Sequence, residues 1–313
     1  MQTVTFMRGL SASGKSTVAK QLVDQGGYVR VNMDDIRSTL ALPFSKDNEN
    51  LALDIQDQII LRALRAGNNV VVDNVHLHGK WPRRIAVLLW EAGIAVDYEI
   101  DDLMSEVTPE VCIYRNAARI AAGRSGVPDH VIPKQAKEWA KELQRGPWTV
   151  ESITRDLPVV EPYGPRKWQL PECLILDIDG TIARRGDRGP FDFDRLDEDT
   201  VWSHVDEMVE RWRRPESEWD GHGKVIVLTG RSAEYQDATS HWLRRHGIQF
   251  DEIYTRAAGD QRRDSIVKLE LFNEHIRNRF DVRAVLDDRL RVCRMWNQLG
   301  LPLFRVGDPD EDF

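Results

Sequence analysis

The chain has 313 residues, of which 41% are hydrophobic and 30% are charged, and its formal net charge is −8. This balance is typical of a globular protein and excludes disorder along the whole chain. The negative charge argues against a protein that coats nucleic acid nonspecifically, but it is compatible with an enzyme that has a local basic groove.

The length predicts two domains, because a single hydrophobic core rarely grows past about 250–300 residues. Prolines and glycines are densest from Gly146 to Pro171, and proline interrupts both helices and sheets. We therefore expect a first domain over residues 1–150, a linker over 151–170 and a second domain over 171–313.

The chain shows no pattern of a membrane or exported protein. No apolar run approaches the roughly 18 residues needed to span a bilayer, and the start lacks the pattern of a signal peptide. Three widely spaced cysteines, Cys112, Cys173 and Cys293, fit a reducing cytosol and are most simply small core residues. We expect a cytoplasmic protein with no membrane partner.

The first half alternates strands and helices. Short apolar runs predict strands at residues 3–7, 28–31 and 70–72, and helical spacing predicts helices at 15–23 and 47–66. In the longer helix Leu51, Ile55 and Ile59 share one face, and Gly67 follows as a stop signal. This alternation implies a parallel sheet covered on both faces.

Between the first strand and the first helix, residues 9–16 match the pattern G-x-x-x-x-G-K-[ST]. The glycines let the backbone N–H groups face a phosphate, Lys15 would reach the β- and γ-phosphates, and the Ser16 hydroxyl would hold Mg²⁺. The helix that begins here adds its positive end. This context favours ATP binding over a chance glycine-rich turn. The candidate nucleotide-binding residues are Gly9, Ser13, Gly14, Lys15, Ser16, Thr17 and Arg115.

An acceptor site is predicted at the ends of the next two strands. A kinase for a hydroxyl needs a carboxylate to orient it and accept its proton, and Asp34 is the candidate. Arg37 follows one helical turn later and could clamp an acceptor phosphate. An N-cap aspartate beside a surface arginine is the alternative. Asp73 could hold Mg²⁺ through water, contact the acceptor, or only end the strand in an Asx turn, and these interpretations stay open.

Arg115, Arg119 and Arg124 lie in a segment with no acidic residue between them. Arg115 and Arg119 are four residues apart, so their like charges repel on one helix face. A lid that binds the transferring phosphate would explain this arrangement. The alternative is a solvated helix face.

The second half repeats the alternation. Strands are predicted at residues 173–176, 225–228 and 284–286, and helices at 201–213, 233–246 and 266–279. This pattern indicates a second α/β domain whose chemistry lies at the carboxyl ends of its strands. The polar stretch 211–224 is expected to be a loop or small cap, and the acidic residues 308–312 a solvated tail.

Asp177 and Asp179 directly follow the first of these strands. In phosphoryl transfer the first aspartate can attack phosphorus, and the second can protonate the leaving alkoxide and later activate water. Paired carboxylates also attract Mg²⁺. Further polar groups end the other strands or lie on a helix, where they could hold phosphate or metal. They are Thr229, Gly230, Arg231, Lys268, Asp287 and Asp288.

These motifs together resemble the bifunctional polynucleotide 5′-kinase/3′-phosphatases of the T-even bacteriophage type. Their P-loop kinase half precedes a phosphatase half of the haloacid-dehalogenase type. The similarity covers nearly the whole chain and rests on GLSASGKST, MDDIR, YRNAAR, DIDGTIA, LTGR and LDDR. RGPFD (188–192) and AAGDQRRD (257–264) are the most specific, because generic phosphatases of this superfamily lack them.

The resemblance implies a role for each matching residue in the kinase half. ATP and Mg²⁺ would bind at Lys15 and Ser16, and Asp34 would be the general base for the 5′-hydroxyl. Arg37 would contact the 3′-phosphate of the acceptor nucleotide, and Arg119 would act on the transferring phosphate.

In the phosphatase half the resemblance implies that Asp177 is the nucleophile and Asp179 the general acid/base. Thr229, Arg231 and Lys268 would hold phosphate. Mg²⁺ would be bound by Asp177, Asp179, Asp287 and Asp288, and the nucleic-acid 3′ end by Arg256 and Arg263.

The leading hypothesis is therefore an enzyme that heals RNA or DNA ends and leaves them ready for a nucleic-acid ligase, with a homo-oligomer left open. One alternative is a small-metabolite kinase fused to a small-molecule phosphatase, although a bare sugar needs no phosphate clamp such as Arg37. Another is a nucleotide-sensing scaffold with a retired phosphatase. That scaffold would have lost Lys15, Asp177 or Asp179, and all three are present.

Overall fold

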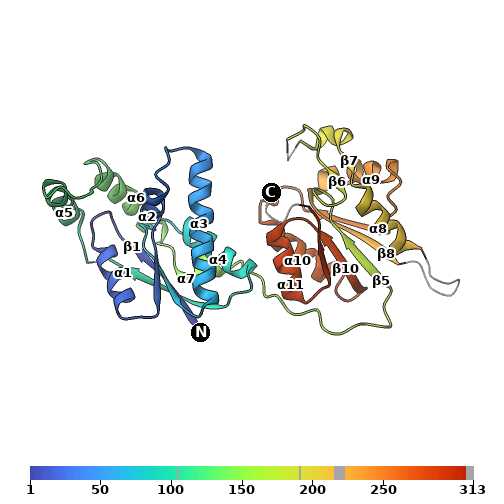
Figure 1. Ribbon diagram of the computed structural model, residues 1–313, viewed down its shortest axis with the longest axis horizontal. Coiled ribbons are helices and arrows are strands. Elements are labelled where there is room, and N and C mark those ends of the chain that lie inside the picture. The colour runs from blue at the N-terminus through green and yellow to red at the C-terminus, as the bar shows by residue number, and fades with distance from the viewer. Residues whose placement is uncertain (104–105, 190–191, 215–222, 308–313) are drawn as a thin grey trace. The chain divides into compact units, whose positions relative to one another are not determined.

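A computed structural model describes residues 1–103, 106–189, 192–214 and 223–307 (Figure 1). The predicted tail at 308–312 lies outside these residues, as does most of the predicted loop at 211–224. The chain divides into two compact units, Met1–Leu157 and Pro158–Phe313. The division lies inside the segment predicted as a linker, and both parts of that segment pack on their own unit.

The first unit is built on a four-stranded parallel sheet with the order β2-β3-β1-β4. Its strands are β1 (Gln2–Arg8), β2 (Tyr28–Val31), β3 (Asn69–Val72) and β4 (Val96–Asp102). Its helices are α1 (Lys15–Asp24), α2 (Met33–Leu40), α3 (Lys46–Arg65), α4 (Lys80–Glu91), α5 (Pro109–Ala121), α6 (Val131–Arg145) and α7 (Val150–Thr154).

Both faces of this sheet are covered, as the apolar strands predicted. Val70 and Val72 pack in the main core with residues of α3 and α4, whereas Val71 packs on the other face against Ala19 of α1. Alternate residues of a strand point to opposite faces, so a strand buried on both sides reads as a continuous apolar run. Trp148 and Ile153 complete the main core, which fixes α7 to this unit.

The second unit is built on a five-stranded parallel sheet with the order β11-β10-β5-β8-β9. Its strands are β5 (Glu172–Leu176), β8 (Lys224–Ser232), β9 (Glu252–Arg256), β10 (Asp281–Asp287) and β11 (Leu303–Arg305). A separate antiparallel ribbon pairs β6 (Ala183–Arg184) with β7 (Thr200–Val201). The helices are α8 (Ser203–Arg213), α9 (Gln236–Arg245), α10 (Asp264–His275) and α11 (Leu290–Leu299), with short 3₁₀ turns η1 (Phe193–Glu198) and η2 (Ala233–Tyr235).

The strand order places a topological switch beside β5. The chain runs from β5 to β8 and β9 on one side and then crosses to β10 and β11 on the other. Ligands of open α/β sheets bind outside the carboxyl ends of the strands at such a switch. The predicted α/β class with two domains is confirmed, and the three buried cysteines are core residues as predicted.

Several predicted boundaries are wrong in detail. The helix predicted over 266–279 runs over Asp264–His275, and the strand predicted at 284–286 runs over Asp281–Asp287. The helix predicted from residue 201 begins at Ser203, because Thr200 and Val201 pair with β6. The strand predicted to end at residue 228 continues to Ser232, so Thr229, Gly230 and Arg231 lie within β8. Strands β4, β6, β7, β9 and β11 were not predicted. In the described part of the chain, no helix combines the length and apolar character needed to cross a membrane.

The segment before β5 is anchored by one aromatic side chain. Tyr163 is 7% exposed, and its hydroxyl donates to the Phe280 carbonyl and accepts from the Val282 N–H at 3.1 Å. We predict that Tyr163→Ala lowers the free energy of unfolding of the second unit by about 3 kcal/mol, because it leaves a cavity and two unsatisfied backbone groups. Urea denaturation measures this change.

The matched control is Val159→Ala in the same segment. Val159 is 80% exposed, so its truncation should change stability by less than about 0.5 kcal/mol. A Tyr163→Ala protein as stable as this control would show that the segment is not part of the folded unit.

Candidate active sites

The loop between β1 and α1 has the tight backbone that the glycine pattern predicted. Gly14 precedes α1 with a φ of 115°, in the left-handed region that favours glycine. A Cβ atom on Gly9 would lie 2.7 Å from the Ser13 hydroxyl oxygen, so a side chain there would displace that hydroxyl. The Ser13 hydroxyl is buried and has no hydrogen-bond partner among the described residues. Ser16 is half-buried and Thr17 is exposed in the first turn of α1.

Lys15 is buried beneath this loop and donates a hydrogen bond to the Leu10 carbonyl at 2.7 Å. Burial lowers the pKa of Lys15 to about 8, the charge of Asp73 opposes this shift, and the charge of Arg119 adds to it. A buried ammonium group with few negatively charged neighbours is stabilised when an anion binds beside it. Lys15 is therefore placed to bind a phosphate group.

Helix α5 brings the predicted arginines to the same loop. Arg115 donates to the Ser13 carbonyl at 2.8 Å, and the charge of Arg119 acts on Lys15. The helix is held over the loop by an apolar cluster of Leu10, Leu77, Cys112, Ile132 and Trp139. Arg124 lies beyond the end of α5 and is exposed.

Asp34 and Arg37 form the pair that their helical spacing predicted. The Asp34 side chain is 88% exposed on the first turn of α2, and Arg37 donates to it at 2.8 Å. Arg37 also donates two hydrogen bonds to Glu49 of α3, at 2.8 and 2.9 Å. Asn32 caps α2 by accepting from the backbone N–H groups of residues 34 and 35, so Asp34 itself is not the N-cap.

Asp73 has a partner, Arg30, that the sequence pattern did not indicate. Asp73 is 1% exposed, and Arg30 of β2 contacts its Oδ2 atom through Nε at 2.7 Å and Nη2 at 2.6 Å. The third nitrogen of Arg30 bonds Asp35, the neighbour of Asp34. The Asp73 Oδ1 atom is buried without a hydrogen-bond partner among the described residues. A water molecule in the shell of a divalent cation would satisfy this oxygen.

The second unit gathers three carboxylates at the switch beside β5. Asp177 follows β5, Asp287 ends β10 and Asp288 follows it, and one oxygen of each lies within 4.8 Å of the others. Lys268 of α10 is fully enclosed and contacts Asp177 and Asp287, at 2.8 Å each. The predicted convergence of these four residues is therefore present in the structure.

Neighbouring groups fix two of these carboxylates. The Trp296 indole donates to Asp287 at 3.1 Å, and the Thr181 hydroxyl donates to Asp288 at 3.1 Å. Gly180 has a φ of 85°, and a Cβ there would lie 2.1 Å from an oxygen of Asp288. The backbone therefore approaches the cluster as closely as only glycine permits.

The charges of the cluster fit a divalent cation. Burial raises the pKa of Asp177 well above its usual range, the charge of Lys268 opposes this shift, and the charges of Asp287 and Asp288 add to it. One ammonium thus does not compensate three carboxylates. Oxygen ligands of this kind suit hard divalent ions, which would supply the missing positive charge.

Asp179 belongs to a different group. Arg231 donates to its two oxygens at 2.8 and 2.6 Å, and Arg188 donates at 3.0 Å. Arg188 also forms a bidentate pair with the enclosed Asp199, at 2.7 and 2.6 Å. Both guanidinium groups lie over the ring of Phe193, at 5.4 and 5.5 Å from its centroid.

This arrangement differs from the roles expected of two residues. Asp179 was expected among the metal ligands, but the structure bonds its carboxylate to two arginines and leaves it out of the three-carboxylate cluster. Arg231 was expected to hold phosphate, and in this structure its guanidinium is bonded to Asp179. Burial would raise the pKa of Asp179, but the hydrogen bonds and charges of Arg231 and Arg188 outweigh it and lower the pKa. Asp179 is therefore ionised at neutral pH in this structure.

The remaining predicted residues line the same edge of the sheet. Thr229 is buried and accepts from the Arg231 N–H at 3.3 Å. Arg256 donates to the Gly230 carbonyl at 3.0 Å and to Asp264 at 3.1 Å, so its contacts lie within the protein and not toward a free surface. A Cβ on Gly230 would lie 2.3 Å from Asp264. Arg263 directly precedes α10.

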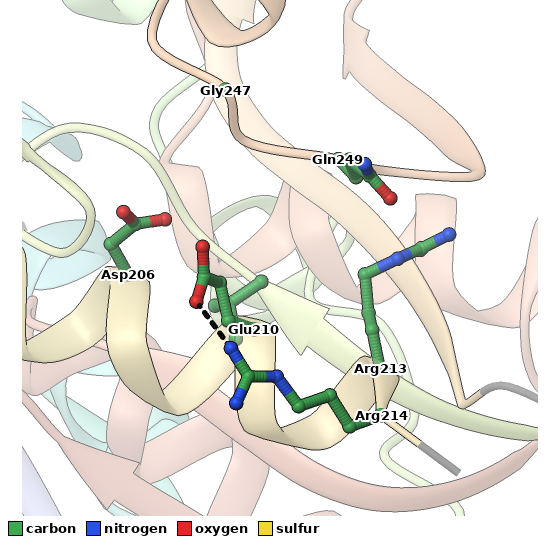
Figure 2. Close-up of a pocket in the computed structure, with 7 residues that line it drawn as sticks. Asp206, Glu210, Arg213, Arg214, Gly247 and Gln249 are labelled. Carbon is green, nitrogen blue, oxygen red and sulfur yellow. Dashed lines mark hydrogen bonds and ion pairs between the residues drawn. The ribbon is translucent and has the colours of Figure 1, made fainter.

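A separate hollow of about 330 Å³ lies beside α8 (Figure 2). Its walls are Asp206, Val209, Glu210, Arg213, Arg214, Gly247 and Gln249. Arg214 points toward Glu210 and forms an ion pair with it at 3.3 Å. Gly247 and Gln249 precede β9 in the chain, and none of the predicted site residues lines the hollow. We therefore assign no chemistry to it.

The contribution of Arg30 to the stability of the first unit can be measured. We predict that Arg30→Met destabilises the first unit by about 3 kcal/mol, because the buried Asp73 carboxylate loses its partner. Replacing both residues, Arg30→Met with Asp73→Leu, should recover most of this loss. Urea denaturation of the two variants measures both effects.

The control is Arg83→Met, which breaks an exposed ion pair with Asp156. The Arg83 side chain is 42% exposed and the Asp156 side chain is 52% exposed. An exposed pair contributes less than about 1 kcal/mol. If Arg30→Met and Arg83→Met lowered the free energy of unfolding equally, Arg30 would not be needed to stabilise the buried Asp73 carboxylate.

Comparison with known proteins matches each half of the chain to a family model. Residues 171–311 match the model of the polynucleotide kinase PNKP phosphatase domain, and residues 4–143 match that of an AAA domain. A relative from Autographa californica nuclear polyhedrosis virus, named "Putative bifunctional polynucleotide kinase/RNA ligase", is 29% identical over 313 residues. That similarity covers 94% of this chain but only 41% of the viral protein, so the chain spans about two fifths of the relative's length.

Similar solved structures include a chain of the Pnkp1/Rnl/Hen1 RNA repair complex, with 25% identity and a TM-score of 0.48 over 99% of this chain and 97% of that one. The APS kinase CysC of Mycobacterium tuberculosis has 22% identity and a TM-score of 0.30 over 46% of this chain and 98% of its own. The two family matches confirm the predicted order of the halves. The second half of the chain is thus similar to the phosphatase domain of polynucleotide kinase PNKP, and the first half is similar to an AAA domain.

Proposed function

We propose that this protein repairs nucleic-acid ends by two reactions. One unit would transfer the γ-phosphate of ATP to a 5′-hydroxyl, and the other would remove a 3′-phosphate. The observation that carries the proposal is the cluster of Asp177, Asp287, Asp288 and Lys268, inside a unit that matches a polynucleotide kinase phosphatase domain. The P-loop with its buried lysine supports the kinase half.

In the kinase unit Asp34 takes the proton of the 5′-hydroxyl. The 5′-oxygen then bonds to the γ-phosphorus, and the bond from that phosphorus to the oxygen of the β-phosphate breaks, which releases ADP. The exposure of Asp34 leaves it open to an acceptor strand. Lys15 and Arg119 offer positive charge to the transferring group, and Arg37 offers its planar guanidinium to a phosphate of the acceptor.

In the phosphatase unit a carboxylate oxygen of Asp177 bonds to phosphorus, and the bond from phosphorus to the 3′-oxygen breaks. Asp179 gives a proton to that oxygen and later takes one from the water that hydrolyses the aspartyl phosphate. Asp179 is ionised while two arginines hold it. An arriving phosphate competes with the Asp179 carboxylate for these two arginines. Its negative charge also favours protonation of Asp179.

Mg²⁺ is the cation that we assign to both units. Asp73 and Ser16 would hold it in the kinase unit, and Asp177, Asp287 and Asp288 in the phosphatase unit. When bound, it would neutralise phosphate charge that the protein's own lysines and arginines leave uncompensated.

The products suggest the next enzyme in the sequence. A 5′-phosphate beside a 3′-hydroxyl is the substrate pair of a nucleic-acid ligase. The name of the viral relative joins a polynucleotide kinase to an RNA ligase, which supports a ligase as the functional partner of this chain.

A doubly labelled oligonucleotide tests both reactions. It carries a 5′-hydroxyl and a 3′-phosphate, in RNA and DNA versions, and is incubated with ATP and Mg²⁺. We predict that the wild-type protein adds the 5′-phosphate and removes the 3′-phosphate. Lys15→Met should reduce 5′ phosphorylation at least 100-fold and leave the phosphatase intact, whereas Asp177→Asn should do the reverse.

Each variant is thus the control for the other, because both keep one active unit. The proposal would be wrong if neither oligonucleotide is modified, or if nucleosides and sugars are phosphorylated as efficiently as oligonucleotides. Retention of 3′-dephosphorylation by Asp177→Asn would remove this residue from the reaction.

A further inference from the structure

The antiparallel ribbon β6–β7 directly follows the loop that carries the candidate catalytic aspartates. The Gly180 N–H donates to the Ala183 carbonyl at 2.9 Å, and the Trp202 N–H donates to the Ile182 carbonyl at 3.0 Å. Gly180 in turn lies against Asp288. The ribbon is therefore fixed by backbone hydrogen bonds at the edge of the three-carboxylate cluster.

The side chains of the ribbon separate into a buried and an exposed set. Ala183 and Val201 pack into the core of the second unit. Arg184 is exposed, and its guanidinium lies over the ring of Trp202 at 5.3 Å from the centroid. Trp202 remains 36% exposed, so part of the indole is open to a second partner.

The positive charge of this ribbon is uncompensated by ion pairs. Arg184 and Arg185 are both exposed, and neither forms an ion pair or hydrogen bond with another described residue. Asp187 is the one acidic residue of the turn from 184 to 187. Most other arginines of the second unit, such as Arg188, Arg231 and Arg256, are bonded to carboxylates.

An exposed indole beside unpaired guanidinium groups fits one class of partner well. A nucleobase that is not stacked in a duplex can lie on the indole or on the planar guanidinium, and the arginines attract the phosphates between bases. A protein partner would need a larger apolar surface, and Trp202 is the large exposed apolar side chain of this ribbon.

We infer that the Arg184–Trp202 pair binds the single-stranded polynucleotide just upstream of its 3′-terminal phosphate. The base of a penultimate nucleotide stacks on this pair, and Arg185 contacts the backbone. The inference rests on the proposed function, since it names the part of the protein that tells a polynucleotide from a mononucleotide in the phosphatase reaction.

Substrate length separates this role from a structural one. A nucleoside 3′-monophosphate can reach Asp177 but has no upstream nucleotide, whereas a single-stranded 3′-phosphorylated decamer has one. We predict that Trp202→Ala lowers kcat/KM for the decamer about tenfold, mainly through KM, and leaves kcat/KM for the monophosphate unchanged. Trp202→Phe should keep most of the decamer activity, because it keeps an aromatic face.

Arg184→Ala should weaken decamer binding several-fold, and it should also reduce the dependence of that binding on salt. The matched control is Trp168→Ala. Trp168 is 75% exposed and stacks with Arg166 at 3.5 Å, but it precedes β5 at the amino end of the strand. This variant should treat both substrates as the wild type does.

Three outcomes distinguish this inference from the proposed function. Equal wild-type activity on the decamer and the monophosphate would contradict the proposed polynucleotide substrate itself. A wild-type preference for the decamer that survives in Trp202→Ala would overturn only the role of the ribbon. A loss on both substrates in Trp202→Ala, with an unchanged melting temperature and no rescue in Trp202→Phe, would also overturn it.

Discussion

Buried carboxylates at the ends of parallel strands need positive partners, and this constraint organises the second unit. Asp177 and Asp287 each lie 2.8 Å from the one ammonium group of Lys268. A buried carboxylate without a partner is strongly unfavourable, so Lys268 both stabilises the cluster and fixes its geometry. The same constraint explains why Arg30 reaches the buried Asp73 in the first unit. Around Asp179 the buried groups are the guanidinium groups of Arg231 and Arg188, which need its carboxylate as a partner. In the first unit the Oδ1 atom of Asp73 is left without a hydrogen-bond partner among the described residues, and a cation-bound water would satisfy it.

Sheet topology brings these groups together from distant parts of the sequence. In the second unit the chain changes direction beside β5, so residues after β5 and β10 meet although they are about 110 positions apart. In the first unit β3 inserts between β1 and β2, which places Asp73 beside Arg30 and within electrostatic range of Lys15. Catalytic groups on rigid strand ends require little rearrangement during the reaction.

Local motifs predicted more of the molecule than long-range partners did. The P-loop and the aspartates after β5 were visible in the sequence because a strand, a turn and a functional side chain are adjacent in the chain. The roles of Arg30, Arg188 and Asp199 were not visible, because their partners are set by strand pairing and by packing around Phe193. The extension of β8 through Thr229 and Arg231 was missed for the same reason. It places Arg231 on Asp179, whereas the motif alone suggested a free phosphate ligand.

We propose that Asp177, Asp287 and Asp288, held by Lys268, form a cation site at which Asp177 accepts a phosphoryl group. A crystal structure with Mg²⁺ and beryllium trifluoride, a mimic of a phosphoryl group on a carboxylate, tests it most directly. We expect the trifluoride on an oxygen of Asp177, a cation bound by carboxylates of this cluster, and Lys268 still in contact with Asp177. A cation bound elsewhere in the second unit, or a trifluoride group on another side chain, would contradict it.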